Sequence, residues 1–175
     1  MAPGLPTSTR RSFLLGGAAL AATVALPAWS VAGMRRASGM DRLLRELRAA
    51  TRGPLVTRSD AGLFLAAQLY NQRFDGRRPY GVLYALDERD VQQAVRWAAR
   101  HEVPITARAG GHSYQGYSSI NDGLIVDLTN LSQVVPRSGP VAYARIGGGA
   151  ALGVTYHELA AIGRTIPGGT CPTVS

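Results

Sequence analysis

The sequence predicts an α/β (α+β) domain whose regular part begins near residue 79. Three observations predict it: short apolar strand segments alternate with helical patterns, a glycine-rich loop follows the second of these strands, and no internal repeat or low-complexity tract interrupts the order. At 175 residues the chain has room for one domain of ordinary size.

The amino terminus is typical of a twin-arginine export signal, which we assign to residues 1–32. Arg10 and Arg11 precede an apolar, alanine-rich stretch that glycines and a proline interrupt. That stretch is about 16 residues long, whereas a transmembrane helix needs about 20, so cleavage after Ala32 is favoured over an uncleaved membrane anchor. We therefore expect a secreted or extracytoplasmic protein that uses the twin-arginine export machinery and keeps no stable membrane span. This pathway carries folded proteins, often around a cofactor, so a cofactor is expected.

Residues 33–74 are interpreted as a lead-in segment. Apolar residues recur at helical spacing after Asp41, which predicts a helix capped by Asp41 and ended by Gly53-Pro54. A second apolar stretch, 63–70, is predicted to be a short helix or a surface strap, and 71–76 the loop after it.

The regular part of the domain lies within residues 75–175. Strands are predicted at 82–86, 105–107, 123–128 and 141–146. Asp87 or Asp90 opens a helix, and a second helix follows the turn 147–149 and ends at Gly163. The predicted inward residues are Val91, Ala94, Val95 and Ala98 in the first helix, and Leu152, Tyr156 and Leu159 in the second. His101 is expected at the end of the first helix as a cation or donor, and His157 is expected to be exposed.

The chain has 19 strongly basic residues against 11 acidic ones, so it carries a net positive charge. All 19 are arginines, because the sequence contains no lysine. Many of these arginines precede Arg58, and the region from Tyr80 onward is nearly neutral. No basic recognition helix or aromatic-interleaved basic strand accompanies them, so nucleic-acid binding is not expected. The absence of lysine excludes a Gly-Lys-Ser/Thr phosphate loop, and the three histidines show no metal spacing.

The segment 108–116, Arg-Ala-Gly-Gly-His-Ser-Tyr-Gln-Gly, carries the predicted chemistry. Its glycines would let the backbone approach a pyrophosphate closely, with Ser113 as a hydroxyl donor and Arg108 as a positive charge. From composition alone, a purely structural turn explains the same glycines. Neither this loop nor residues 147–152 fits Gly-x-Gly-x-x-Gly, so a Rossmann dehydrogenase is disfavoured.

Three motifs in order resemble a known family: Arg-Pro-x-x-Val-Leu-Tyr-Ala at 78–85, Arg-Ala-Gly-Gly-His-Ser-Tyr-x-Gly at 108–116, and Pro-Gly-Gly-Thr-Cys-Pro-Thr-Val at 167–174. From about residue 71 to 174 the chain resembles the first part of the flavin-binding domain of the covalent FAD-linked oxidases related to vanillyl-alcohol oxidase and berberine bridge enzyme. The resemblance implies a PCMH-type FAD-binding domain over 75–175, of which the first α/β subdomain is present and the carboxyl-terminal part is incomplete.

The resemblance also implies a covalent FAD. His112 would bond to the 8α-methyl carbon of the flavin, and Cys171, as in the bicovalent subgroup, to its 6-position. An imidazole and a thiolate are suitable nucleophiles for an electron-poor flavin, and two tethers would fix the ring and favour hydride acceptance. Without the resemblance, the only cysteine would be interpreted as a small buried apolar residue. The implied cofactor-binding residues are Arg108, Ala109, Gly110, Gly111, His112, Ser113, Tyr114, Gly116 and Cys171.

The implied activity is that of an FAD-dependent oxidoreductase acting on the CH–OH group of an alcohol, sugar or natural product. Hydride would pass to the flavin, with O2 as the expected acceptor, and the catalytic base is expected beyond residue 175. The family that the chain resembles usually has a glycine where this chain has Ser175. Two hypotheses follow: the chain is a piece of a longer secreted flavin oxidase, or it is a truncated, catalytically inactive remnant or flavin-binding module.

Overall fold

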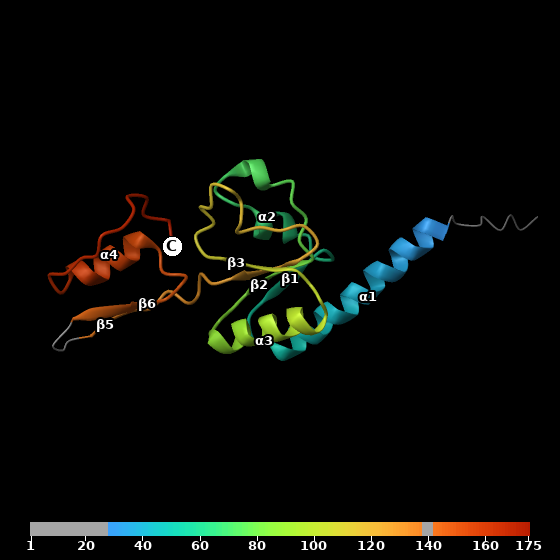
Figure 1. The fold of residues 1–175 in the computed structure, drawn as a ribbon, viewed down its shortest axis with the longest axis horizontal. Helices are drawn as coiled ribbons and strands as arrows, with labels where there is room; N and C mark the ends of the chain where they lie inside the picture. The colour runs from blue at the N-terminus through green and yellow to red at the C-terminus, as the bar shows by residue number, and fades with distance from the viewer. Residues whose placement is uncertain (1–27, 138–141) are drawn as a thin grey trace, which may run out of the picture.

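The computed structural model describes residues 28–137 and 142–175. A four-stranded sheet forms its centre, and a two-stranded hairpin with one helix lies beside it (Figure 1). The elements in order are α1 (Ala28–Ala50), β1 (Leu55–Thr57), α2 (Leu63–Ala67), a 3-10 turn (Gln72–Phe74), β2 (Gly81–Tyr84), α3 (Glu88–Arg100), β3 (Ile105–Arg108), β4 (Leu124–Asp127), β5 (Val134–Arg137), β6 (Tyr143–Ile146) and α4 (Leu152–Ala160). The predicted α/β class is confirmed.

The sheet has the strand order β1-β2-β4-β3. The strands β2, β4 and β3 are parallel, and β1 pairs antiparallel with β2. The helix α3 supplies the crossover from β2 to β3, and residues 109–123 lead from β3 back to β4, which lies between these two strands. The carboxyl ends of the three parallel strands therefore meet at one edge, and the glycine loop begins at that edge, directly after Arg108.

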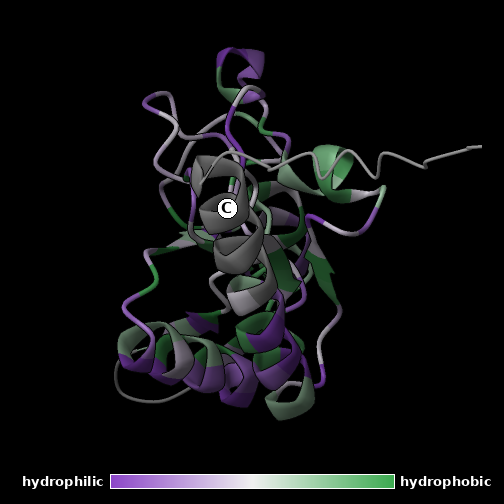
Figure 2. Ribbon diagram, turned by 90° about the vertical axis from the view of Figure 1, so that its right-hand side faces the viewer, coloured by the Kyte–Doolittle hydropathy of each residue, from purple (hydrophilic) through white to green (hydrophobic). Residues whose placement is uncertain are grey.

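The two faces of the sheet are covered by different helices: α1 and α3 lie on one side and α2 on the other (Figure 1). Alternate residues of β4 divide accordingly, because Leu124 and Val126 pack toward α1 and α3 while Ile125 packs toward α2. The central strands are hydrophobic, and the helices beside them also carry hydrophilic residues (Figure 2).

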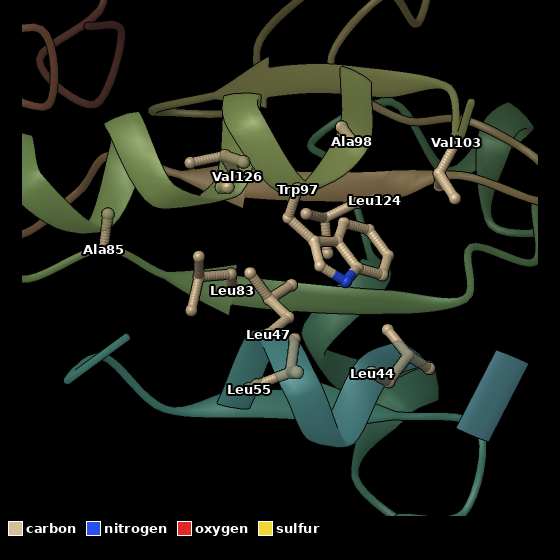
Figure 3. Close-up of a cluster of buried hydrophobic side chains, with 11 residues drawn as sticks. Leu44, Leu47, Leu55, Leu83, Ala85, Trp97, Ala98, Val103, Leu124 and Val126 are labelled. Atoms are coloured by element: carbon tan, nitrogen blue, oxygen red, sulfur yellow. The ribbon is translucent and has the colours of Figure 1, made fainter. Parts of the chain in front are cut away.

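Trp97 of α3 is the largest side chain in the main core. It lies with Leu47 of α1 and Leu124 of β4 and is 3% exposed (Figure 3). Its indole N–H also donates to the carbonyl of Leu43 at 2.9 Å, so the one side chain fixes α1 against α3 by packing and by a hydrogen bond. Val95, which we predicted to face inward, is 51% exposed, so that part of the prediction is wrong.

Asp87 is the residue that opens α3. Its carboxylate accepts from the backbone N–H of Asp90 at 3.0 Å, as an N-cap does. Asp90 has another role, because it is buried and accepts from the backbone N–H groups of Arg52, Gly53 and Leu86. Of the two residues predicted to open this helix, Asp87 is therefore the N-cap.

The helix α1 ends as predicted, before Gly53-Pro54, but it begins at Ala28, so Asp41 lies inside it and is no cap. The residues ahead of Asp41 include Met34, Arg35 and Arg36, which are good helix formers and extend the helix. The predicted signal, 1–32, falls outside the described residues apart from 28–32. Among the residues that the structure describes, no helix combines the length and the apolar character that crossing a membrane requires.

The hairpin of β5 and β6 pairs antiparallel, with Val134 opposite Ile146, and α4 follows it after the turn 147–149. The strand predicted at 141–146 is found at Tyr143–Ile146, and Val141 lies outside the described residues. In α4, Leu159 is buried and His157 is exposed, both as predicted. His101 ends α3 as predicted, with its Nε2 atom 3.2 Å from the Glu46 carboxylate.

Candidate functional site

A pocket of about 510 Å³ opens where the glycine loop meets the carboxyl-terminal segment. It draws together most of the residues that the sequence singled out, although they come from two distant stretches of the chain. The lining consists of Tyr70, Ala109, Gly110, Gly111, His112, Ser113, Tyr114, Ser118, Cys171, Val174 and Ser175. Arg108 and Gly116, also predicted, support the loop from outside this lining.

The imidazole of His112 is held on two sides. Its ring stacks on Tyr70, with the ring centroids 4.3 Å apart and the planes 23° from parallel. Its Nε2 atom lies 2.8 Å from the hydroxyl oxygen of Thr173. The ring therefore has a fixed orientation, which a nucleophile or a ring-bonded anchor requires.

Cys171 shares the Thr173 hydroxyl with His112, since its sulfur lies 3.5 Å from Thr173 Oγ1. The pKa of the Cys171 thiol is lowered from its ordinary value of 9.0, chiefly by the hydrogen bond from the Thr173 side chain and then by backbone N–H groups of Thr173 and Val174. Burial acts in the opposite direction. The site thus places an imidazole and a thiol of raised acidity beside one hydroxyl group.

The segment 171–175 lies here because α4 binds its backbone. The N–H groups of Leu152 and Gly153 begin α4 and lack partners within the helix. They donate to the carbonyls of Val174 and Pro172 at 2.7 and 2.9 Å. On its other side, the segment approaches Gly110 so closely that a Cβ there would lie 2.3 Å from the Thr173 carbonyl oxygen. The segment therefore joins α4 to the glycine loop.

Replacing Gly110 by alanine is expected to push the segment 171–175 away from the loop without unfolding the sheet, because the new methyl group would overlap the Thr173 carbonyl. Amide hydrogen exchange at Leu152 and Gly153 should then speed up roughly tenfold or more, since these N–H groups lose their acceptors. The matched control is Gly76→Ala, where a Cβ meets no atom within 4 Å. Equal exchange rates in the two variants would contradict the prediction.

The far end of the glycine loop is fixed by Phe74 and Arg77. Gly116 has a φ of +72°, and a Cβ there would meet the Phe74 ring at 2.7 Å, so this position needs glycine for both reasons. Arg77 lies 4.7 Å from the same ring and donates to the carbonyls of Gly116 and Ser119. The N–H of Gly116 donates to the Ser113 carbonyl at 3.0 Å, which closes the turn.

Arg108 forms a buried ion pair beneath the loop. Its Nε donates to the Asp127 carboxylate at 2.7 Å, and the two residues are 6% and 2% exposed. They are register partners in β3 and β4, so each ends its strand at the same edge. The charge of Arg108 is thus already paired within the fold. Its predicted role toward a phosphate stays a prediction.

Several residues of the site have no counterpart in the sequence-based prediction: Tyr70, Thr173 and Asp127. Thr173 lies within the third motif, but nothing in that motif distinguishes a hydroxyl that contacts His112. Tyr114, which was predicted to bind the cofactor, lines the pocket while 88% exposed. In the described part of the chain, no three His, Cys, Asp or Glu side chains are grouped to hold a metal ion.

Comparison with known proteins adds independent information. Residues 79–175 match a family model described as an FAD binding domain. The chain is 34% identical over 123 residues to an uncharacterized FAD-linked oxidoreductase of Bacillus subtilis, with 70% of this chain and 27% of that protein covered.

Solved structures agree with this match. The wild-type berberine bridge enzyme-like protein 1 of Physcomitrella patens has a TM-score of 0.66 and 32% identity, over 75% of this chain and 29% of that one. A carbohydrate oxidase from Microdochium nivale also gives a TM-score of 0.66, with 28% identity over 75% of this chain and 28% of its own. The present chain thus spans less than a third of the length of these proteins.

Proposed function

The chain belongs to the FAD-binding-domain family, and from that premise we propose that it forms the flavin-binding part of an FAD-dependent oxidoreductase. The pocket beside His112 has a volume of about 510 Å³, within the usual range for cofactor sites. No Asp or Glu side chain occurs among the residues that line it, and the hydroxyl groups of Ser113 and Ser118 can donate hydrogen bonds there. This lining fits an anionic pyrophosphate.

We propose further that the flavin is attached covalently through His112 and Cys171. The observation that carries this proposal is their meeting at one hydroxyl: Thr173 Oγ1 lies 2.8 Å from His112 Nε2 and 3.5 Å from Cys171 Sγ. The stacking of Tyr70 fixes the imidazole plane, and the lowered pKa of Cys171 raises the fraction of thiolate. Both groups are then ready nucleophiles on one side of the pocket.

When bound, the flavin would accept a hydride from the CH–OH carbon of an alcohol, sugar or natural product and would pass the electrons to O2. The name of the carbohydrate oxidase from Microdochium nivale supports a sugar within this class. The residues of this chain would bind and orient the cofactor, and His112 and Cys171 would keep it from leaving between turnovers.

The test of attachment is the intact mass of denatured protein after incubation with FAD. We expect the wild type to gain the mass of one FAD. We expect the single variants His112→Ala and Cys171→Ala to retain it through the remaining bond, and the double variant to lose it. The matched control is His157→Ala, an exposed histidine outside the pocket lining, which should behave as the wild type.

The outcomes separate the two proposals. A wild type that binds FAD when native but shows no added mass when denatured would refute covalent attachment and leave FAD binding intact. A wild type that binds no FAD at all would refute the flavin-binding proposal for this chain. Release of hydrogen peroxide from a panel of sugars and alcohols tests the oxidase activity, and it requires flavin-loaded protein that also contains the catalytic base expected beyond residue 175.

We propose lastly that residues 1–32 direct export by the twin-arginine machinery, as Arg10 and Arg11 ahead of the apolar stretch suggest. A reporter protein fused to residues 1–32 should leave the cytoplasm. The fusion with both arginines replaced by lysine should remain inside. Export of the lysine variant at the original rate would refute the twin-arginine route.

A further inference from the structure

We propose that Thr173 is a positioning residue that relays a proton from the Cys171 thiol to His112, so that Cys171 reacts as a thiolate. The inference rests on the proposed function, because it gives Thr173 a part in preparing one of the two nucleophiles for the flavin. It assigns a role to a residue outside the two proposed attachment points.

The geometry provides both halves of a relay. Thr173 Oγ1 lies 2.8 Å from His112 Nε2 and 3.5 Å from Cys171 Sγ, which is within reach for a hydrogen bond to sulfur. A hydroxyl group has one proton to donate and lone pairs to accept with, so it can accept from one neighbour while it donates to the other. Tyr70 stacks on the imidazole and holds Nε2 toward the hydroxyl.

The proton transfer balances without any further reactant. At the start, the Cys171 S–H donates to Thr173 Oγ1, and the Thr173 O–H donates to Nε2 of a neutral His112 that carries its proton on Nδ1. The S–H bond breaks as a new O–H bond forms on Thr173, and the original O–H bond breaks as an N–H bond forms on Nε2. The products are a thiolate and an imidazolium, with Thr173 now donating to sulfur and accepting from Nε2. Two protons each move across one hydrogen bond, the net result is the transfer of one proton from sulfur to Nε2, and no electrons are transferred.

The surroundings make His112 the natural destination of the proton. Among the residues that line the pocket, the ionisable side chains are those of Tyr70, His112, Tyr114 and Cys171, and none of these is an arginine or a carboxylate. The two residues of α4 whose backbone N–H groups donate to the segment, Leu152 and Gly153, carry no ionisable side chain. Protonation of His112 therefore supplies the one cationic side chain in this lining that can stabilise the thiolate.

Backbone groups act on Cys171 independently of the relay. The N–H groups of Thr173 and Val174 also lower the pKa of the thiol, and they remain when the Thr173 side chain changes. Removing the hydroxyl should therefore raise the pKa of Cys171 only part of the way to that of a free cysteine.

The test is the pH dependence of alkylation of Cys171 by iodoacetamide in the flavin-free full chain. Cys171 is the only cysteine, so the intact mass reports on it alone. Thr173→Val keeps the shape of the side chain but removes the hydroxyl. We expect it to shift the midpoint to higher pH and to slow alkylation at neutral pH roughly 3- to 10-fold. Thr173→Ser should restore the wild-type profile. His112→Gln should shift the midpoint upward as well, because the amide group does not accept the proton.

The control is Thr165→Val, an exposed threonine outside the pocket lining, which should leave the profile unchanged. A profile of Thr173→Val equal to that of the wild type would overturn the proposal. So would a serine variant as slow as the valine variant, or a glutamine variant at position 112 with an unchanged midpoint. The alkylation is measured without FAD, so a chain that alkylates as expected but acquires no flavin would refute the proposed function and leave the relay standing.

Discussion

Replacing Asp90 by alanine is expected to destabilise the protein by about 3–5 kcal/mol, because three backbone N–H groups would lose the buried carboxylate that accepts from them. Asp90 is 1% exposed and accepts from the N–H groups of Arg52, Gly53 and Leu86 at 2.8, 2.9 and 3.0 Å. The carboxylate thereby fixes the connection between α1 and β1 to the end of β2 and the start of α3. A loss of this size is a large share of the stability of an ordinary domain.

Urea unfolding followed by circular dichroism measures this loss. The control is Glu88→Ala, which removes an exposed carboxylate from the same turn of α3 and should change the free energy of unfolding by no more than about 0.5 kcal/mol. Asp90→Asn should fall between the two, since an amide keeps one acceptor oxygen but presents N–H groups to the remaining donors. A cost below about 1 kcal/mol for Asp90→Ala would mean that water replaces the carboxylate.

Replacing Arg108 by methionine is expected to cost about 3–5 kcal/mol as well, for a different reason. The change leaves the Asp127 carboxylate buried, at 2% exposure, without its cation. Arg108 also donates to the carbonyl of Gln68 at 3.3 Å, so the segment leading to Tyr70 loses an anchor and the stacking on His112 should loosen.

The double variant Arg108→Met, Asp127→Asn separates charge from packing. It removes the uncompensated carboxylate but keeps an oxygen that can accept from the Thr129 N–H, which the wild-type carboxylate does at 3.0 Å. We expect it to recover a substantial part of the stability that the single variant loses, again measured by urea unfolding. If the double variant were as unstable as the single one, packing of the arginine stem would be the dominant contribution.

The central part of the fold was predictable because each of its elements has a clear period. The apolar runs of β2 and β4, the proline ahead of β3 and the capped amphipathic pattern of α3 are local signals. By contrast, β1 has only three residues, and β5, although as long as β2 to β4, contains Pro136 and has no buried residue, so neither shows a clear strand pattern. Trp97 rather than Val95 faces the core because α1 packs against that side of α3, which no local pattern encodes.

The residues of the site also divide into those that the sequence predicts and those that only the fold brings together. The loop around His112 and the cysteine motif are contiguous in sequence, so they could be recognised. Tyr70 and Thr173 contact His112 only through the tertiary fold. The pair of Arg108 and Asp127 did leave a signal, because an arginine ends one strand and an aspartate ends the next, and parallel neighbours in register bring such ends together. This signal predicts the ion pair only once β3 and β4 are known to be neighbours in the sheet.

The contact of residues 171–175 with the glycine loop also determines the order in which the two sides of the pocket form during synthesis. Thr173 follows His112 by 61 positions, so at about 5–20 residues per second a ribosome adds it about 3–12 s later. By late in that interval Tyr70, the glycine loop and β4 at the sheet edge have been synthesised, whereas the segment that carries Cys171 has not. The pocket therefore first has only the side formed by the glycine loop and Tyr70. Its other side is completed when α4 has formed and its N–H groups bind residues 171–175.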